Sequence, residues 1–214
     1  MSSPFYPPEF TELSQEVLTE VLDAVPDAIL IGGWATWVRV GGDMSHDIDL
    51  IVSPGDKTVI GNLAEDLSES RHIAQRKWRA TWRGIHLDLY VPYQSVLGGR
   101  LELRVERLAE YPDVAGGYRL LTVDAHIATK LAAVLGRPKD RPGQKDRKEL
   151  WKLLNLGGSN TPGVLLDASQ RTPDELADLV TEAFGYISET PGLTRADRND
   201  LYATQAEWVR TLTS

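Results

Sequence analysis

Residues 28–52 read AILIGGWATWVRVGGDMSHDIDLIV. A short apolar run over 28–32 leads into the pair Gly32-Gly33, and the residues that follow predict a helix over 34–40. After a second glycine pair, residues 47–52 alternate between acidic and apolar side chains, which is typical of a strand. The stretch therefore predicts a strand, a helix that begins directly after a glycine turn, and a second strand.

Three acidic residues belong to predicted strands, two in this stretch and one later in the chain. Asp47 and Asp49 share one face of the second strand because successive side chains of a strand point to opposite faces. Asp88 lies in a further alternating run, IHLDLY. Each motif alone has a plain alternative, a solvated strand face or an ordinary glycine turn. Together they indicate a site for hard divalent cations, which bind carboxylate oxygens, and for phosphates, which approach glycine amides at a helix N-terminus.

Other elements follow from apolar spacing and from turn residues. Helices are expected over residues 11–25, 57–70, 122–135, 145–155, from Thr172 onward, and over 195–212. Strands are expected over 73–82, 85–91, 101–107 and 118–121, and loops over 136–143 and 156–162. The order predicts an α+β protein with a sheet domain over 1–120 and a helical domain over 121–214.

Composition limits the function classes. The 214 residues include 42% hydrophobic and 25% charged residues, as in ordinary globular proteins. Cysteine is absent, which excludes disulfides and thiolate metal sites. No apolar run approaches the roughly 20 residues that cross a bilayer, and the first residues lack the features of a signal peptide. We therefore expect a cytoplasmic protein without a membrane partner.

Charge is distributed unevenly along the chain. The net charge of −8 argues against general binding to a nucleic-acid backbone, which needs a basic surface. Two segments are nevertheless basic: 71–83 has no acidic residue, and 137–148 has six basic residues against two acidic ones. They could form a locally basic cleft, or they could be two solvated faces.

The glycine pair Gly32-Gly33, followed by Asp47-x-Asp49 and Asp88, resembles the signature of the polymerase-beta-type nucleotidyltransferase superfamily. The resemblance covers roughly residues 28–91 and implies a mixed sheet flanked by helices, with a C-terminal helical part that completes the active site. It implies an NTP substrate and two Mg²⁺ ions, with Mn²⁺ as a substitute, held by the three aspartates. Asp88 would also help to deprotonate an acceptor hydroxyl, in keeping with two-metal nucleotidyl transfer.

Two later segments, 124–137 and 144–150, resemble motifs of AbiEii-type abortive-infection toxins and of the related MenT-type toxins. The resemblance implies that Lys130 neutralises the triphosphate and that Asp146 is a further active-site acid. Glu149 stands where the family usually has Asp, which leaves its role open. Ser45 matches a position that is often Ser or Thr, and it would touch phosphate or accept a regulatory phosphate.

The toxin resemblance also implies a function. The chain would be a toxin of a toxin–antitoxin pair that transfers a nucleoside monophosphate to an RNA acceptor, with the 3′ end of tRNA as the expected acceptor. The basic segments would contact the phosphates of that acceptor. A cognate antitoxin would be its protein partner.

Two other functions stay open. Gly32-Gly33-Trp34-Ala35 with Ser45-His46-Asp47-Ile48-Asp49 also looks like the opening of lincosamide and aminoglycoside nucleotidyltransferases, and an acidic protein suits a cationic drug. A non-catalytic protein that binds a nucleotide or a partner is the third candidate. The set of three acids argues against it, because facing buried carboxylates are costly without a metal.

The aromatic candidates have two interpretations. Trp34, at the glycine turn, is a candidate nucleotide contact, and Trp78 and Trp82 lie in a basic stretch. Each could stack on a base, as aromatic side chains do in nucleic-acid sites, or pack in the core. Core packing is expected for at least two of them.

Several polar candidates also have structural alternatives. Lys130 could extend from an amphipathic helix to solvent, and Asp146 could be a first-turn acid that interacts with the helix dipole. Ser45 could serve the turn alone. His46 and His126 are expected to form hydrogen bonds, because two isolated histidines make a poor zinc site.

Overall fold

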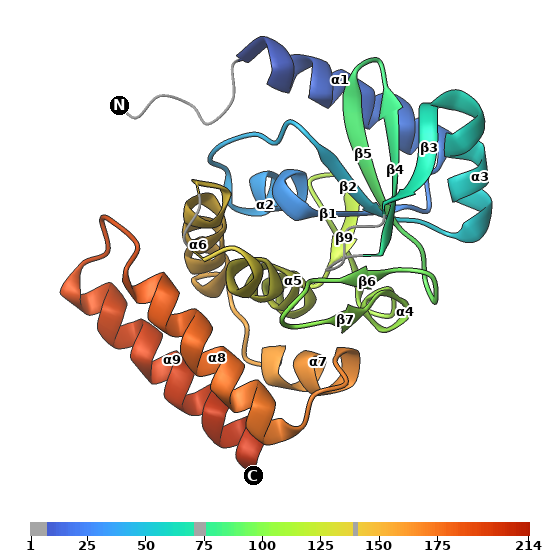
Figure 1. The fold of residues 1–214 in the computed structure, drawn as a ribbon. Helices are drawn as coiled ribbons and strands as arrows, with labels where there is room; N and C mark the ends of the chain where they lie inside the picture. The colour runs from blue at the N-terminus through green and yellow to red at the C-terminus, as the bar shows by residue number, and fades with distance from the viewer. Residues whose placement is uncertain (1–7, 71–75, 139–140) are drawn as a thin grey trace. The chain divides into compact units, whose positions relative to one another are not determined.

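The computed structural model describes residues 8–70, 76–138 and 141–214 of the chain. The chain folds into two compact units, Met1–Leu97 with Arg104–Thr122 and Gly98–Leu103 with Val123–Ser214. The first unit contains the main sheet, and the second contains mostly helices (Figure 1). The assignment of functional domains to 1–120 and 121–214 stays a prediction.

The first unit is built on a mixed sheet. In the described residues it has seven strands in the order β3-β4-β5-β2-β1-β9-β8 (Figure 1). The strands are β1 (Ile29–Ile31), β2 (Ile48–Ile51), β3 (Glu65–Ser70), β4 (Lys77–Trp82), β5 (Ile85–Tyr90), β8 (Pro112–Ala115) and β9 (Tyr118–Leu121). The pairs β2–β5 and β1–β9 are parallel, and the other neighbours are antiparallel.

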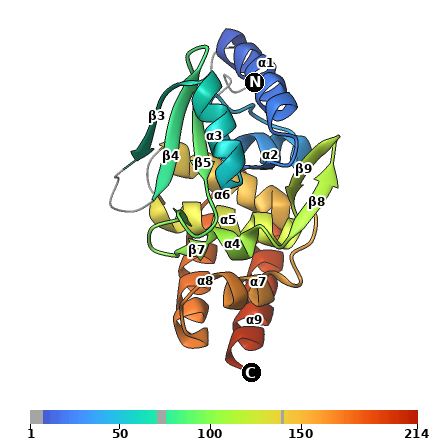
Figure 2. The same cartoon turned by 90° about the vertical axis from the view of Figure 1, so that its right-hand side faces the viewer.

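The helices α1 (Pro8–Ala24), α2 (Gly32–Val40) and α3 (Pro54–Leu63) flank this sheet, and the unit also contains the short helix α4 (Val105–Leu108). Figure 2 shows α1 and α3 beside strands β4 and β5. Apolar side chains of α1, α2 and α3 share one buried cluster with alternate strand residues, such as Ile48 and Leu50 of β2 and Leu87 of β5. The residues between them point to the opposite face, so Asp49 and Asp88 lie on the face away from this core.

The second unit contains α5 (Val123–Gly136), α6 (Arg141–Leu154), α7 (Thr161–Ala168), α8 (Pro173–Ser188) and α9 (Arg195–Thr213). Helices α8 and α9 lie side by side (Figure 2), and the rings of Phe184 and Trp208 meet edge to face at 5.2 Å. Both helices begin with a capping box, at Thr172 and at Thr194, which satisfies backbone N–H groups of the first turn.

The predicted α+β class, a mixed sheet flanked by helices with a helical C-terminal part, is confirmed. The prediction of a helix over 57–70 is wrong in its second half. Helix α3 starts at Pro54 and ends at Leu63, and Glu65–Ser70 form the edge strand β3. The sequence EDLSES has neither helical nor alternating apolar spacing, so pairing with β4 is what makes it a strand.

Three other predictions need correction. The segment 101–107 contains β7 (Leu103–Arg104) followed by α4, rather than one strand, and 156–162 includes the start of α7. The loop expected over 136–143 ends earlier, because α6 begins at Arg141; residues 139–140, like residues 71–75 of an expected strand, lie outside the described residues. Strands β6 (Val96–Leu97) and β8 are too short or too polar to be recognised from the sequence.

None of the described helices is long and apolar enough to span a membrane.

The contact between Phe184 and Trp208 predicts a large stability effect. Trp208 is 1% exposed, so Trp208→Ala should lower the free energy of unfolding by about 3–5 kcal/mol through lost burial and a cavity. Urea unfolding followed by circular dichroism measures this loss. Tyr202→Ala, on the same helix but 50% exposed, is the control and should cost less than about 1 kcal/mol. Equal losses in the two variants would contradict this account of the helix pair.

Candidate functional site

Gly32, the first residue of α2, lies against the carboxylate of Asp49. It follows Ile31, which pairs with Asp49 across β1 and β2. A Cβ atom on Gly32 would lie 2.2 Å from Asp49 Oδ2, and Gly32 has a φ of +68°, in the left-handed region that favours glycine. Both the space and the backbone conformation therefore require glycine here. The arrangement brings the Asp49 carboxylate to the N-terminal end of α2.

Asp49 and Asp88 are direct neighbours in the sheet. They are register partners in the parallel strands β2 and β5, so their side chains lie on the same face. The side chain of Asp88 is only 8% exposed. Asp47 lies just before β2, and its side chain is 46% exposed. The structure thus places two of the predicted acids side by side and the third in the loop directly before β2.

Two cations from β4 hold Asp88. Arg79 Nε donates a hydrogen bond to Asp88 Oδ1 at 3.0 Å, and Lys77 Nζ donates one to Oδ2. Arg79 is the register partner of Asp88 on this side, and Lys77 lies two residues before it on the same face. The hydrogen bond and the charge of Asp88 raise the pKa of Arg79 above its ordinary value and outweigh the opposing effect of burial.

Lys77 and Arg79 were predicted only as members of the basic segment 71–83, and not as partners of Asp88. The signal is present in the chain, because the runs KWRATW and IHLDLY flank the turn Arg83-Gly84 and alternate in the same way. An antiparallel hairpin at this turn places Lys77 and Arg79 on the face of Asp88. The two strands and their turn are predicted from the sequence, whereas the cross-strand ion pairs are not.

The acids do not form a metal-binding cluster in this conformation. Within residues 8–70, 76–138 and 141–214, no group of three or more His, Cys, Asp or Glu side chains is placed to hold a metal ion. Both oxygens of Asp88 are engaged by cations, and Asp47 Oδ1 lies 3.1 Å from His46 Nδ1. Metal binding by Asp47, Asp49 and Asp88 therefore stays a prediction.

The residues predicted to bind nucleotide occupy different environments. Helix α2 begins at Gly32 and Gly33, and its N-cap residue Ile31 makes no side-chain capping hydrogen bond. Trp34 is 1% exposed, and its Nε1 donates to Ser14 Oγ at 2.9 Å, so its ring packs in the core, the second of its two interpretations; a nucleotide role for Trp34 stays a prediction. Ser45 is buried in the loop before β2. Trp78 and Trp82, both on β4, pack against the core cluster that contains Trp34.

Lys130 and Asp146 meet in a buried ion network of the second unit. Lys130 Nζ, on α5, lies 3.4 Å from Asp146 Oδ1 and also donates to Glu149 Oε2, both on α6. Arg137 Nε donates to Asp146 Oδ2 at 2.7 Å. The alternative of a lysine that extends to solvent is therefore wrong, because Lys130 is buried, and Asp146 is not a first-turn acid, because α6 begins at Arg141. His126 is also buried, on α5. The nucleotide role of Lys130 stays a prediction.

The basic segments are largely paired with acidic groups or backbone carbonyls. In the first segment, residues 71–75 lie outside the described residues, Lys77 and Arg79 contact Asp88, and Arg83 pairs with Glu16 and Glu20. In the second segment, Arg137 pairs with Asp146, Lys145 with Glu149, and Arg147 donates to the Pro138 carbonyl. These contacts neutralise much of the positive charge on which the hypothesis of a locally basic cleft depended.

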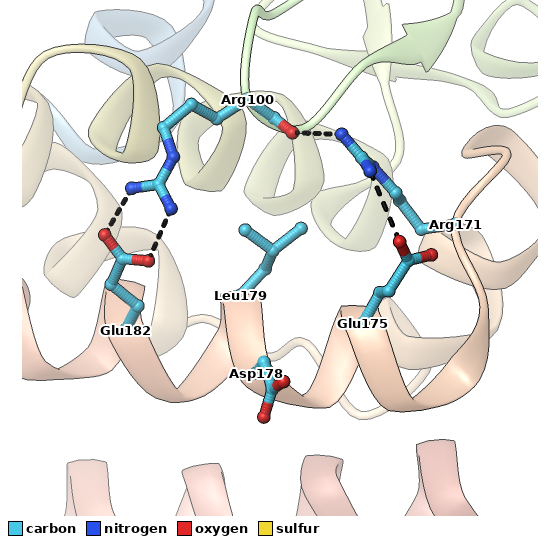
Figure 3. Close-up of a pocket in the computed structure, with 6 residues that line it drawn as sticks. All are labelled: Arg100, Arg171, Glu175, Asp178, Leu179 and Glu182. Carbon is cyan, nitrogen blue, oxygen red and sulfur yellow. Dashed lines mark hydrogen bonds and ion pairs between the residues drawn. The ribbon is translucent and has the colours of Figure 1, made fainter.

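A shallow pocket of about 340 Å³ lies on α8 in the second unit and was not predicted. Figure 3 shows Arg100 and Arg171 each turned toward a glutamate of α8. Arg100 Nη2 lies 2.7 Å from Glu182 Oε2, and its hydrogen bond lowers the pKa of Glu182 below its ordinary value. Arg171 donates to the Arg100 carbonyl oxygen. These contacts attach segment 98–103 to α8 and leave both arginines neutralised.

Comparisons with known proteins agree with this architecture only loosely. No family model matches the chain, and no curated protein matches its sequence. Among solved structures, a nucleotidyltransferase-like antigenic protein of Paracoccidioides brasiliensis aligns with a TM-score of 0.49 and 15% identity, over 96% of this chain and 95% of that one. JHP933 of Helicobacter pylori aligns with a TM-score of 0.47 and 11% identity, over 97% and 95%. A candidate nucleotidyltransferase of Thermotoga maritima aligns with a TM-score of 0.45 and 15% identity, over 72% and 97%.

The contact between Gly32 and Asp49 can be tested against a matched glycine. Gly32→Ala should lower the free energy of unfolding by about 3 kcal/mol, because it combines a positive φ with a Cβ clash against Asp49. Gly84 has a φ of +81° and no atom near its Cβ position, so Gly84→Ala adds only the cost of a left-handed backbone and should lower the free energy of unfolding by about 1 kcal/mol. Urea unfolding of both variants measures the difference. Similar costs would show that Asp49 does not pack against Gly32.

The buried network predicts a pH dependence. Burial raises the pKa of Asp146, but the charges of Lys130 and Arg137 outweigh it and hold the pKa below its ordinary value of 3.8. Its carboxylate therefore contributes stability that is present above about pH 4 and is lost as the pH falls through the folded-state pKa. Asp146→Asn should cost about 3 kcal/mol at pH 7 and flatten the loss of stability below pH 4.

Urea unfolding measured from neutral to acidic pH tests this expectation. Asp178→Asn removes the same charge from an exposed position on α8 and is the control. It should leave the pH dependence close to that of the wild type. If Asp146→Asn behaves in the same way as the control, the network does not stabilise the fold.

Proposed function

We propose that the chain is a metal-dependent nucleotidyltransferase that moves a nucleoside monophosphate from an NTP to a hydroxyl of an acceptor. One observation carries the proposal. Asp49 and Asp88 are register partners on neighbouring parallel strands, and the Asp49 carboxylate lies against Gly32 at the start of α2. Acids and a helix N-terminus with a closely approached glycine are what binding of a metal–triphosphate complex requires.

The nucleotide would bind at the N-terminal end of α2. Gly32 and Gly33 lack side chains that would block the approach of phosphate oxygens to the backbone, and the N-cap residue Ile31 makes no capping hydrogen bond. The Trp34 side chain supports the position of this helix from the core, through its hydrogen bond to Ser14. Ser45 is proposed to act near the phosphates through its place in the loop before β2.

The donor set fits Mg²⁺ or Mn²⁺ in its chemistry. Asp47, Asp49 and Asp88 provide hard carboxylate oxygens, and the last two lie on one sheet face beside a glycine whose missing Cβ makes room. When bound, the ions would stabilise the attacking and leaving oxygens of the transfer. Asp88, on β5, would help to deprotonate the acceptor hydroxyl.

Lys130 and Asp146 are proposed as further active-site residues by resemblance to AbiEii- and MenT-type toxins. Lys130 would offset phosphate charge. In this structure its ammonium is balanced by Asp146 and Glu149, so a phosphate role requires a change in that network. Glu149, whose role the sequence leaves open, is here a direct partner of Lys130.

For the acceptor we propose RNA, with the 3′ end of tRNA as the first choice, and hence a toxin with a cognate antitoxin. The support is the resemblance of residues 124–150 to the toxin motifs. A cationic small molecule, such as a lincosamide or aminoglycoside drug, is the second candidate. The net charge of −8 and the paired state of the basic segments favour it.

A transfer assay distinguishes the acceptors. The full chain is incubated with each labelled NTP, Mg²⁺ and either total tRNA or a drug panel. Label on tRNA supports the toxin proposal, and label on a drug supports the second candidate. Absence of transfer to every acceptor, with a folded protein, contradicts nucleotidyl transfer.

The aspartates provide the mutational test. Asp49→Asn should reduce transfer by at least about 100-fold, because it removes a carboxylate that would hold the metal–triphosphate complex. Asp23→Asn removes the same charge from an exposed position on α1 and should leave transfer within about twofold. Comparable transfer by the two variants would remove Asp49 from the active site.

A further inference from the structure

The partners of Asp88 differ on its two sides. β5 lies between β4 and β2 in the sheet. On the β4 side its register partner is Arg79, with Lys77 two residues away on the same face, and on the β2 side its register partner is Asp49. Asp88 therefore has a cationic neighbour strand and an anionic one. It can pair with the cations directly, or with Asp49 through a shared cation.

The structure shows the first of these arrangements. Arg79 and Lys77 each take one oxygen of the Asp88 carboxylate. The side chains of Lys77 and Asp88 are 12% and 8% exposed, so an unpaired charge on either would be costly. The internal cations thus compensate Asp88 in a structure where no three acids are placed to bind a metal within the described residues.

Lys77 is the partner better suited to be displaced by an ion that enters the buried site. It takes the more buried position, whereas Arg79 is 47% exposed. Lys77 Nζ also lies 5.8 Å from the centre of the Tyr90 ring, on the same strand as Asp88. A cation over an aromatic face keeps part of its compensation when it leaves a carboxylate. The Tyr90 ring is already close to Lys77 Nζ in the paired state, so it can keep compensating the ammonium when the contact with Asp88 is lost.

We propose that Lys77 is a displaceable counter-ion of Asp88, which must leave Asp88 Oδ2 before a divalent cation can bind between Asp88 and Asp49. This inference rests on the proposed function, since it concerns the same site. Lys77 protects the site from repulsion between carboxylates in the absence of metal, and it weakens metal binding because the metal competes with it. Lys77 is a positioning residue in this scheme and does not touch the substrate.

Metal binding measured without nucleotide tests the proposal. Mn²⁺ is titrated into the full chain, and free Mn²⁺ is followed by electron paramagnetic resonance. Lys77→Met should bind Mn²⁺ at least about fivefold more tightly than the wild type, because it removes a cation in direct contact with a ligand. Lys77→Gln is a second variant that keeps a neutral hydrogen-bond donor for Asp88, and it should show the same direction if Lys77→Met does not fold.

Two controls separate this effect from a general change in charge. Lys57→Met removes one positive charge from the same unit, at a lysine whose ammonium contacts Gln94 and the Trp78 ring. It should change Mn²⁺ affinity by less than about twofold. Adding Asp88→Asn to Lys77→Met should abolish the gain. Unchanged affinity in both Lys77 variants, or an equal gain in Lys57→Met, overturns the proposal.

Transfer activity measured on the same proteins separates the two claims. Tighter Mn²⁺ binding in the Lys77 variants, without transfer by the wild type to any acceptor, supports the counter-ion role and contradicts nucleotidyl transfer. Transfer by the wild type, with unchanged Mn²⁺ affinity in the variants, supports nucleotidyl transfer and contradicts the counter-ion role of Lys77. A lack of Mn²⁺ binding by every folded variant overturns both.

Discussion

The pairing of β2 with β5 places Asp49 and Asp88 at neighbouring positions on one sheet face, and the rest of the site depends on this constraint. Backbone register keeps these two residues side by side, so the charge of their carboxylates must be compensated by other groups. The fold provides two kinds of compensation. Cations of β4 contact Asp88, and the N-terminal end of α2 faces Asp49 through Gly32.

The same principle organises the second unit, where buried charges are again compensated locally. Lys130 lies between Asp146 and Glu149, and Arg137 covers the remaining oxygen of Asp146. A buried lysine without these acids would be costly, and so would the acids without the lysine. Candidate functional residues in both units therefore also have a structural role. Substitutions at these positions need a measurement of folding beside one of activity.

Much of the architecture could be predicted locally. The helix after Gly32-Gly33, the strand of Asp49 and the capped start at Thr172 follow from periodicity and capping, which act over a few residues. The strand Glu65–Ser70 could not, because its polar sequence is extended only through pairing with β4. The buried place of Trp34 was equally open, since a tryptophan beside a glycine turn can face a ligand or the core, and its hydrogen-bond partner Ser14 lies on another helix.

By itself, the sequence determined that Asp49 and Asp88 each point away from the apolar residues of their own strand, because side chains alternate along a strand whatever its neighbours are. It also determined the glycine pair that begins α2. Only the tertiary structure decided that Asp88 lies between the cations of β4 and Asp49 of β2. Strand order arises from contacts between distant segments, so the two cations in KWRATW become partners of Asp88 only after the sheet has formed.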